Sequence, residues 1–221
     1  YSAFSGKTYE ESIAPIPGDD ITLTIDINIQ TAAEKALADT IKNTKGANAG
    51  ATVIKDVNSG EILAICSYPA YNINDFSKNY ARLLKDKNKP LFNRALSGLY
   101  EPGSTFKPIT ALAAMGSNNL APGEKILTRG SYRYYDREFR CNIFREKGKT
   151  HGKIDVTEAL GVSCNYFFYE LAHRMGIKKI ADTAALFGLG APTGIELSSE
   201  EATGHIASFD SRDTTWYAGD T

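Results

Sequence analysis

The chain has 221 residues, of which 42% are hydrophobic and 23% charged, a composition typical of a globular protein large enough to bury a core. Twenty-five Lys and Arg residues nearly balance 26 Asp and Glu residues, so the formal net charge of -1 gives no general attraction to nucleic acid or to an anionic membrane. No apolar run approaches the roughly 20 residues of a membrane span and the first residues lack a signal-peptide pattern, so we expect any membrane anchor to lie outside this chain.

The first half of the chain predicts one helix and three strands. Residues 20–26 (DITLTID) alternate apolar and polar side chains, as a half-buried strand does, and residues 28–43 carry apolar side chains at helical spacing after a cap at Asp26 or Asn28. Residues 51–57 and 61–67 are rich in β-formers and flank Asn58-Ser59-Gly60, which predicts a hairpin with Gly60 free to take a positive φ. The polar residues 68–90 predict a long surface excursion.

The second half is predominantly helical in its patterns. Residues 104–116 predict a helix that closes at Gly116, and three more helical patterns occupy residues 155–163, 165–176 and 178–188. The last two of these patterns end at glycine, which favours separate helices.

The motif Ser104-Thr-Phe-Lys107 follows a Pro-Gly turn and opens one of these predicted helices. Lys107, at i+3, would share a helix face with Ser104, so its amine could reach the serine hydroxyl. A neutral lysine can activate a serine as a nucleophile, and burial together with the positive end of the helix dipole would lower the lysine pKa toward that form. The spacing alone favours an N-capping serine with an exposed lysine.

Longer segments resolve this ambiguity by resemblance. NRALSGLYEPGSTFKPITALAAM resembles the active-site segment of class B penicillin-binding proteins, the D,D-transpeptidases that cross-link peptidoglycan, and is most similar to their PBP2 group. The segments LTIDINIQTAAEKAL, GATVIKDVNSGEILAICSYPAYN, HGKIDVTEALGVSCNYFFYELAHRMGI and FGLGAPTGIEL resemble the same family in the same order, over residues 15 to 221. The resemblance implies an α/β (α+β) fold shared with serine β-lactamases, an antiparallel sheet flanked by helices.

The resemblance also implies catalytic roles. Ser104 would attack the D-Ala-D-Ala carbonyl, Lys107 would accept its proton, Ser163 would relay a proton to the leaving D-Ala, and Asn165 would hold the substrate amide. Ser77-Lys78-Asn79 and Ser117-Asn118-Asn119 also fit the bare Ser-x-Asn pattern, but only Ser163 has the flanking residues of the family. The implied ligands are peptidoglycan stem peptides and β-lactams, with a membrane glycan polymerase as partner and no nucleic acid.

One family motif is missing. The Lys-Thr/Ser-Gly triplet occurs nowhere in the chain. We therefore expect residues 1–221 to form a partial transpeptidase domain, without the pedestal module, the membrane anchor and the Lys-Thr-Gly strand. We expect this partial domain to be inactive by itself. The intact protein would act at the outer face of the cell membrane in cell-wall synthesis and cell shape. The alternatives are a β-lactamase or β-lactam sensor of the same fold, and a non-catalytic zinc-stabilised scaffold.

Four residues offer ligand atoms for a metal: Asp136, Cys141, His151 and Cys164. Thiolate, imidazole and carboxylate are the ligands that zinc prefers in a closed tetrahedral site, although this spacing is not that of a zinc finger. Some PBP2-like relatives resemble this chain in having zinc ligands at the positions of Cys141, His151 and Cys164, which implies a structural zinc ion beside Ser163, with Asp136 as the tentative fourth ligand. One alternative is a Cys141–Cys164 disulfide. The other is a site without metal, with Cys164 a small buried residue, His151 a capped turn histidine and Cys141 a surface thiol.

The remaining candidates carry less chemistry. Cys66 ends an apolar strand and is predicted to be a core residue, and His173 and His205 show no evident partner in the sequence. Residues 129–149 are rich in Arg, Lys and aromatic side chains, but Asp136, Glu138 and Glu146 interrupt them, which favours a solvated loop over a nucleic-acid surface.

Overall fold

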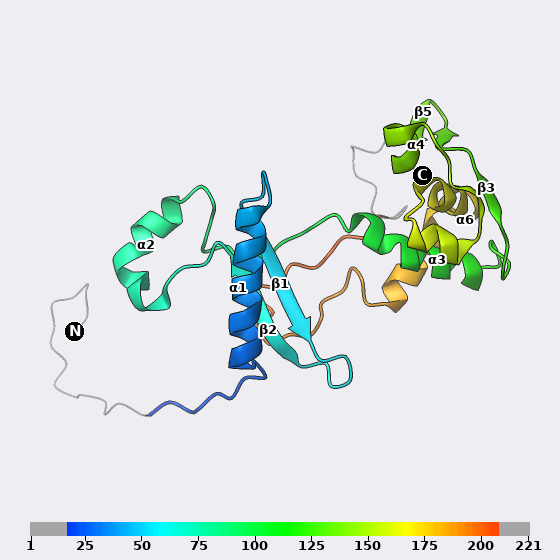
Figure 1. The fold of residues 1–221 in the computed structure, drawn as a ribbon. Helices are drawn as coiled ribbons and strands as arrows, with labels where there is room; N and C mark the ends of the chain where they lie inside the picture. Colours follow the sequence, from blue (N-terminus) through cyan, green and yellow to red (C-terminus); the bar gives the residue numbers. More distant parts are fainter. Residues whose placement is uncertain (1–16, 208–221) are drawn as a thin grey trace, which may run out of the picture. The chain divides into compact units, whose positions relative to one another are not determined.

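A computed structural model of the chain describes residues 17–207. These residues divide into two units, the first ending at Ala95 and the second beginning at Leu96. Figure 1 shows the elements of both units along the chain. Each unit has its own core, so each is described by itself.

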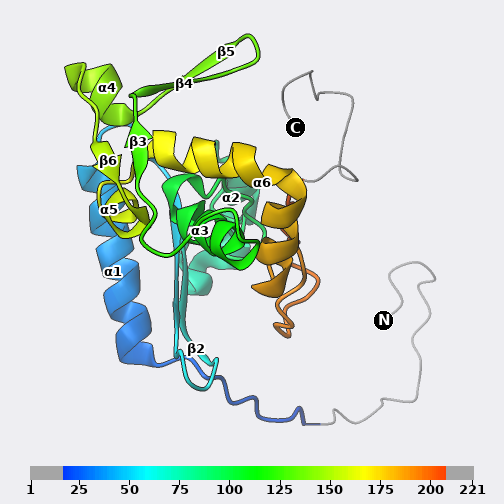
Figure 2. The same cartoon turned by 90° about the vertical axis from the view of Figure 1, so that its right-hand side faces the viewer.

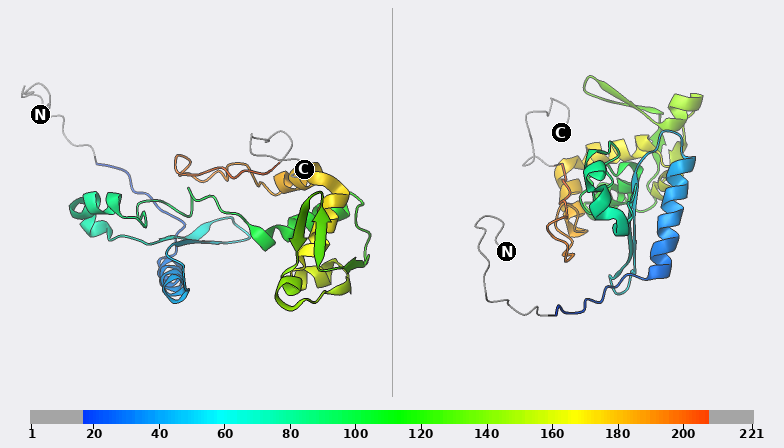
Figure 3. Two further views of the ribbon diagram at one scale, coloured as in Figure 1. Left: turned by 90° about the horizontal axis from the view of Figure 1, so that it is seen from above. Right: turned by 90° about the vertical axis from the view of Figure 1, so that its left-hand side faces the viewer.

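The first unit is a helix packed on a β-hairpin. Strands β1 (Gly50–Lys55) and β2 (Ile62–Tyr68) pair antiparallel, and helix α1 (Ile27–Asn43) lies against one face of them (Figure 3). Asp26 caps α1 by accepting hydrogen bonds from the backbone N–H groups of Asn28 and Ile29. The core of this unit is small and consists of Ala33, Ala64 and Cys66, surrounded by Ile29, Leu37 and Ile54.

The predicted hairpin is confirmed, and Gly60 adopts a φ of +86° in its loop. The predicted strand at residues 20–26 is wrong. This segment is extended but forms no strand, because its contacts with β2 are single hydrogen bonds at the edge, from the Asp26 N–H to Leu63 O and from Thr24 Oγ1 to Ile62 O. Ile21 and Leu23 are accordingly exposed, Ile21 by 85%.

The excursion at residues 68–90 contains more structure than its composition predicts. A short 3-10 helix, η1 (Ile73–Asp75), leads into helix α2 (Phe76–Lys85). Leu83 is the buried residue of α2, and Asn72 caps η1 through its side chain. The sequence carries a signal for this helix, because Phe76, Tyr80 and Leu83 recur at i, i+4 and i+7 among polar residues.

Between Leu96 and residue 207, the second unit combines four α-helices with two strand pairs. In chain order its elements are η2 (Gly103–Phe106), α3 (Lys107–Gly116), β3 (Ile126–Thr128), β4 (Ser131–Tyr134), β5 (Arg137–Arg140), α4 (Asn142–Lys147), β6 (Gly152–Ile154), α5 (Val156–Gly161) and α6 (Asn165–Leu186). Strand β3 pairs antiparallel with β6, and β4 pairs antiparallel with β5 as a hairpin.

Helix α6 organises the core of the second unit. It packs along α3, and Figure 2 shows the two helices next to each other. The side chains between them are small on α3 and large on α6, so the helices approach closely. The buried members of this core are Ala111, Ala113, Ala114, Leu120, Ile126, Cys141, Ile154, Ala159, Cys164, Phe167, Phe168, Leu171 and Met175.

A break at Gly176 divides α6. This glycine has φ +74° and ψ 164°, outside the helical region, so the element consists of two helical halves joined at Gly176. The two helices predicted for residues 165–176 and 178–188 are therefore confirmed as separate halves of one element. A positive φ is open to glycine because it has no Cβ.

The predicted fold class is confirmed in its mixture of helices and antiparallel strands. Within residues 17–207 the antiparallel sheet is limited to two-stranded pairs, because none of the described strands adds a third partner to β1 and β2. No described helix is both long and apolar enough to cross a lipid bilayer.

Candidate active site and metal centre

Ser104 lies in the 3-10 turn that precedes α3. The backbone N–H of Lys107 donates to Ser104 O, an i to i+3 bond, and Gly103 before them has φ +55°. The predicted α-helix over 104–116 therefore starts three residues late, at Lys107, with Pro108 in its first turn where no backbone partner is lost. Since side chains at i and i+3 of a 3-10 turn eclipse each other, Ser104 and Lys107 leave the turn on the same side.

The Ser-x-Asn segment, residues 163–165, joins α5 to α6. Asp155 and Glu158 fix the start of α5 by a reciprocal capping box, and the backbone N–H of Cys164 donates to Ala159 O at its end. Ser163 takes a φ of +50°, a left-handed conformation that is costly for a residue with a Cβ. The surrounding bonds thus hold Ser163 in a strained turn, as is common where a side chain must be aimed at a reacting group.

Lys107 reaches into this turn. Its Nζ donates to Ser163 O at 2.8 Å, to Ser163 Oγ at 2.9 Å and to Asn165 Oδ1 at 2.6 Å. Three acceptors match the three donors of an ammonium group. The structure therefore brings together three of the four predicted catalytic residues, and no hydrogen bond from Lys107 Nζ to Ser104 Oγ occurs among the described residues.

The surroundings of Lys107 act on its proton in opposite directions. Burial lowers the pKa of the Lys107 amine from its ordinary value of 10.5, and the neighbouring Cys141 and Cys164 act in the raising direction. The Phe168 ring lies 5.5 Å from Nζ, which also favours the charged amine. The amine is thus held in place as a donor while burial brings the neutral form closer to physiological pH.

The other two matches to the Ser-x-Asn pattern begin at Ser77 and Ser117. Ser77 is in α2 of the first unit, and Ser117 follows α3, where its Oγ donates to Ala113 O. Neither serine contacts Lys107 in the described residues.

A second group of side chains lies directly behind the Ser-x-Asn turn. The ligand atoms of Cys141, His151 and Cys164 all lie within 4.8 Å of one another, and Cys141 Sγ is 3.7 Å from His151 Nδ1. Zn–S and Zn–N bonds of about 2.3 and 2.0 Å at tetrahedral angles separate two ligand atoms by about 3.6 Å. The three residues therefore fit three corners of a zinc site.

Both sulfurs of this group are free thiols and buried, with exposures of 1% for Cys141 and 0% for Cys164. Burial raises the pKa of the Cys164 thiol to about 11, so the thiol is neutral at physiological pH in the protein alone. A bound divalent cation reverses this preference by stabilising the thiolate. The chemistry of the donors therefore fits a soft cation such as zinc.

The fourth predicted ligand, Asp136, lies outside this group. It occupies the tip of the β4–β5 hairpin, whereas Cys141 follows the other end of β5. Four residues of extended strand separate the two by about 13 to 16 Å along the chain. The short separation in sequence suggested that Asp136 and Cys141 share a site. In the structure they lie at opposite ends of strand β5.

Sequence reasoning missed one interacting pair in this unit. The Tyr132 hydroxyl and His173 Nδ1 are 2.6 Å apart, joining β4 to α6. A contact over 41 residues leaves no local pattern in the sequence. The only available signal was the concentration of tyrosines in residues 132–135.

Comparisons with known proteins show the family to which the chain belongs. The family described as penicillin binding protein transpeptidase domain matches residues 50–216. This chain belongs to that family. The chain is similar to a curated relative named peptidoglycan D,D-transpeptidase MrdA, of Escherichia coli (strain K12). The two are 35% identical over 220 residues, which cover 96% of this chain and 33% of MrdA. The chain thus spans about a third of the length of this transpeptidase relative.

Solved structures of penicillin-binding proteins share the fold. PBP2 of Pseudomonas aeruginosa is 37% identical, with a TM-score of 0.68 over 80% of this chain and 39% of that one. Penicillin-binding protein A of M. tuberculosis, as its penicillin G acyl-enzyme complex, is 29% identical, with a TM-score of 0.66 over 76% of this chain and 40% of that one. The predicted PBP2-like family and transpeptidase fold are therefore confirmed.

Proposed function

We propose that this chain supplies the serine, lysine and Ser-x-Asn parts of a peptidoglycan D,D-transpeptidase. The single observation that carries the proposal is the position of Lys107 Nζ, within 2.9 Å of both Ser163 Oγ and Asn165 Oδ1 and one 3-10 turn after Ser104. An ordinary surface lysine would have no reason to be partly buried with three protein acceptors. The name of the E. coli relative supports the same reaction.

In the proposed acylation step, Ser104 Oγ attacks the carbonyl carbon of the penultimate D-Ala. The Ser104 hydroxyl proton passes to Lys107 in its neutral form, which burial makes more accessible. The tetrahedral intermediate places a negative charge on the former carbonyl oxygen, and the backbone N–H of Ser104 is one donor available to it. The C–N bond then breaks, and the leaving amine takes a proton through Ser163 Oγ from Lys107, giving the acyl-enzyme and free D-Ala.

In the second step, an amine of another stem peptide attacks the same carbonyl. The attacking amine gives up a proton to Lys107, the ester bond to Ser104 breaks, Lys107 passes that proton to Ser104 Oγ, and the new amide is the cross-link. Asn165 holds the substrate amide in both steps, because a side-chain amide can donate and accept at once. A β-lactam would follow the first step only, its ring amide being opened by Ser104.

A structural zinc ion is proposed behind this turn. Cys141, His151 and Cys164 would hold it, and Asp136, at its observed position, would not. When bound, zinc would supply a rigid link between these three residues and no water activation. Since Cys164 lies between Ser163 and Asn165, that link would restrain both catalytic side chains from behind.

The cellular setting follows from the proposed reaction. Stem peptides and β-lactams would be the ligands, and the intact protein would work at the outer face of the cell membrane beside a glycan polymerase. The acyl-enzyme complex of the M. tuberculosis relative supports the β-lactam part.

Covalent labelling tests the proposal. This chain and a longer protein that extends to a Lys-Thr/Ser-Gly strand are each exposed to a penicillin, and intact mass is followed over time. We expect one adduct per molecule, at least in the longer protein, that is lost in Ser104→Ala. Ser117→Ala is the matched control, because it removes a hydroxyl from the other end of the same helix.

Three outcomes would contradict this account. No adduct in either folded protein favours a scaffold. An adduct that survives Ser104→Ala places the nucleophile elsewhere. An adduct that hydrolyses within seconds indicates a β-lactamase, since a transpeptidase acylated by penicillin should release it slowly.

A further inference from the structure

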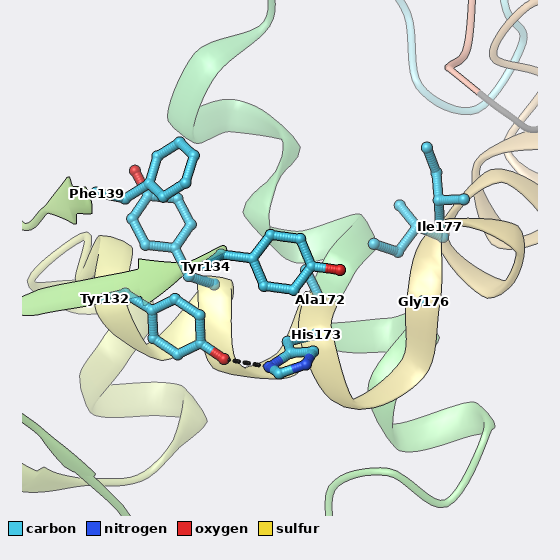
Figure 4. Close-up of a pocket in the computed structure, with 9 residues that line it drawn as sticks. Tyr132, Tyr134, Phe139, Ala172, His173, Gly176 and Ile177 are labelled. Carbon is cyan, nitrogen blue, oxygen red and sulfur yellow. Dashed lines mark hydrogen bonds between the residues drawn. The ribbon is translucent and has the colours of Figure 1, made fainter. Parts of the chain in front are cut away.

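Helix α6 carries aromatic side chains on two sides. Three of them recur at i, i+3 and i+7 and pack on Tyr132 of the β4–β5 hairpin, with ring distances of 5.3, 6.2 and 6.1 Å; they are Tyr166, Tyr169 and His173. The last two line a cavity of about 260 Å³ between the hairpin and α6, where the Tyr132 hydroxyl meets His173 (Figure 4). Phe168 lies outside this stripe, and its ring meets the active-site lysine instead.

The register of α6 places Phe168 beside the Ser-x-Asn turn. Phe168 is three residues after Asn165, so the two side chains are neighbours on one face of the helix. Both reach the amine of Lys107, since Asn165 Oδ1 lies 2.6 Å from Nζ and the centre of the Phe168 ring lies 5.5 Å from it. One turn of α6 therefore contacts the lysine with a polar group and with a ring.

The ring of Phe168 is fixed by its packing. Its side chain is 5% exposed and belongs to the core of the second unit, together with Ala111 of α3. The ring of Phe167 packs on it edge to face, at 5.5 Å between ring centres. A close-packed side chain cannot move away without disturbing its neighbours. The fold thus sets the distance between this ring and the lysine.

The ring distinguishes the two protonation states of Lys107. The three hydrogen bonds to Ser163 and Asn165 satisfy the donors of the ammonium group, and the ring adds an attraction that needs no further donor. An aromatic face attracts a cation within about 6 Å through its quadrupole, and the attraction is stronger where water is excluded. A neutral amine carries no net charge, so the ring favours the charged form over the neutral one.

The proposed acylation step makes this difference useful. Lys107 is neutral before it takes the hydroxyl proton of Ser104, and it is an ammonium group afterwards. An interaction that is stronger with the charged amine stabilises the transition state more than the ground state, and it therefore speeds the step.

We propose that Phe168 is a positioning residue of the reaction: its ring holds the Lys107 amine in the Ser-x-Asn turn and stabilises the positive charge that the amine gains from Ser104. The inference rests on the proposed function, because it needs Lys107 to be the base. It gives a part to a residue outside the Ser-x-x-Lys and Ser-x-Asn motifs.

Fluorine substitution on the ring tests this inference in the longer protein. Phe168 is replaced by phenylalanine with one, two or three ring fluorines, which nearly keep its shape and progressively weaken its quadrupole. Stopped-flow labelling separates the acylation rate constant at saturating penicillin from the dissociation constant of the initial complex. Both are measured on the alkaline plateau of the acylation profile, where the amine starts neutral in every variant. We expect the rate constant to fall stepwise, by about fivefold with three fluorines, and the dissociation constant to stay unchanged.

Two controls separate this effect from a disturbance of the core. Phe167 receives the same three fluorines, because it is the adjacent residue and is fully buried, and because among the described residues no cation lies over its ring. This change should leave the rate constant as it is. The second control places the three-fluorine ring at position 168 of Lys107→Met. There it should no longer change the residual rate, since the ring acts through the lysine.

A second measurement reads the contact without the reaction. The 221-residue chain is labelled with carbon-13 at the ε carbon of its lysines, and the Lys107 signal is the one that disappears in Lys107→Met. A ring face this close shifts the attached protons upfield. Phe168→Leu should move the signal towards that of an exposed lysine, whereas Phe167→Leu should leave it in place.

The outcomes distinguish a failure of this inference from a failure of the proposed function. An acylation rate constant that ignores the fluorines, falls equally with the Phe167 substitution, or still falls in Lys107→Met would overturn the inference. So would a Lys107 signal that ignores Phe168→Leu in a protein that penicillin labels at Ser104, and the proposed function would then stand. A signal that responds, in a folded longer protein that forms no adduct, would overturn the proposed function and leave Phe168 only its contact with the lysine.

Discussion

The two ends of the first half of α6, residues 165–176, differ in the contacts that their side chains make. At its first residue, Asn165 joins Ser163 in accepting the hydrogen bonds of Lys107, with buried Cys164 behind them. At its last turn, His173 and Gly176 line a half-exposed pocket of aromatic rings. The same helix therefore supports a saturated polar network at one end and an open apolar surface at the other.

This difference predicts how tolerant each end should be. Removing a partner from the partly buried network at the first end leaves a polar group without its hydrogen bond, which costs up to about 3 kcal/mol. Changing a ring on a half-exposed surface affects mainly what can bind there. Substitutions at the first end should impair the reaction, and substitutions at the pocket should leave it nearly intact.

The largest expected effect is that of Lys107→Met. Without the amine, acylation by a penicillin in a protein that labels should slow by about 10² to 10⁴, the usual contribution of a general base. Lys125→Met is the control, because Lys125 pairs with Glu158 at the surface of the same unit. The rate constant is measured by labelling with a fluorescent penicillin, and equal rates for the two variants would show that Lys107 is not the base.

The pH dependence of acylation should be the next largest effect. The active base is the neutral amine, so the rate should rise about tenfold per pH unit below the Lys107 pKa and level off above it. Because burial lowers this pKa, the plateau should begin below 10.5. Stopped-flow acylation between pH 6 and pH 10, with Lys107→Met as the control, measures the profile. A profile that keeps its slope in the variant would assign the titration to another group.

Removal of the proposed metal should have a moderate effect. Cys164→Ala should lose about one zinc per chain and lower the melting temperature by about 5 °C or more, whereas Cys66→Ala, a buried thiol of the first unit, should keep the metal. Metal content is read by mass spectrometry of elements in zinc-loaded protein. A chain without zinc whose mass is lower by two hydrogen atoms would indicate a Cys141–Cys164 disulfide instead.

The smallest expected effect is that of Tyr132→Phe, next to the pocket at the last turn of the first half of α6. Tyr132→Phe removes the hydroxyl that contacts His173 and should reduce the free energy of unfolding by about 1 kcal/mol, with acylation changed by less than about twofold. Tyr135→Phe, at the exposed hairpin tip, should change stability by less than about 0.5 kcal/mol. Urea unfolding measures both. A large loss of acylation in Tyr132→Phe would show that the two ends of the helix are coupled.

The sequence predicted the local elements better than the contacts between them. The hairpin around Gly60 and the helical halves that meet at Gly176 follow from turn residues and apolar spacing, and the structure confirms both. The prediction of a strand at residues 20–26 was wrong. Alternating apolar and polar residues form a strand only where a neighbouring strand supplies a full set of backbone hydrogen bonds, and here β2 accepts only single hydrogen bonds from Thr24 and Asp26.

The candidate site was predicted in part. The family resemblance gave Lys107, Ser163 and Asn165, and the structure brings them together; their catalytic roles and that of Ser104 remain predictions. Cys141, His151 and Cys164 lie together, but the distance along β5 separates Asp136 from them. The pocket between the β4–β5 hairpin and α6 could not be predicted, because it depends on the hairpin register and on the contact between Tyr132 and His173 across 41 residues.

The central claim is that the Lys107 network activates Ser104. The most direct test maps the penicillin adduct by tandem mass spectrometry after tryptic digestion of the longer protein. The claim predicts an adduct in the peptide Ala95–Lys125, localised to Ser104, and none in the peptide Ile154–Arg174, which contains Ser163. An adduct on Ser163, on a cysteine, or on any residue other than Ser104 would contradict it.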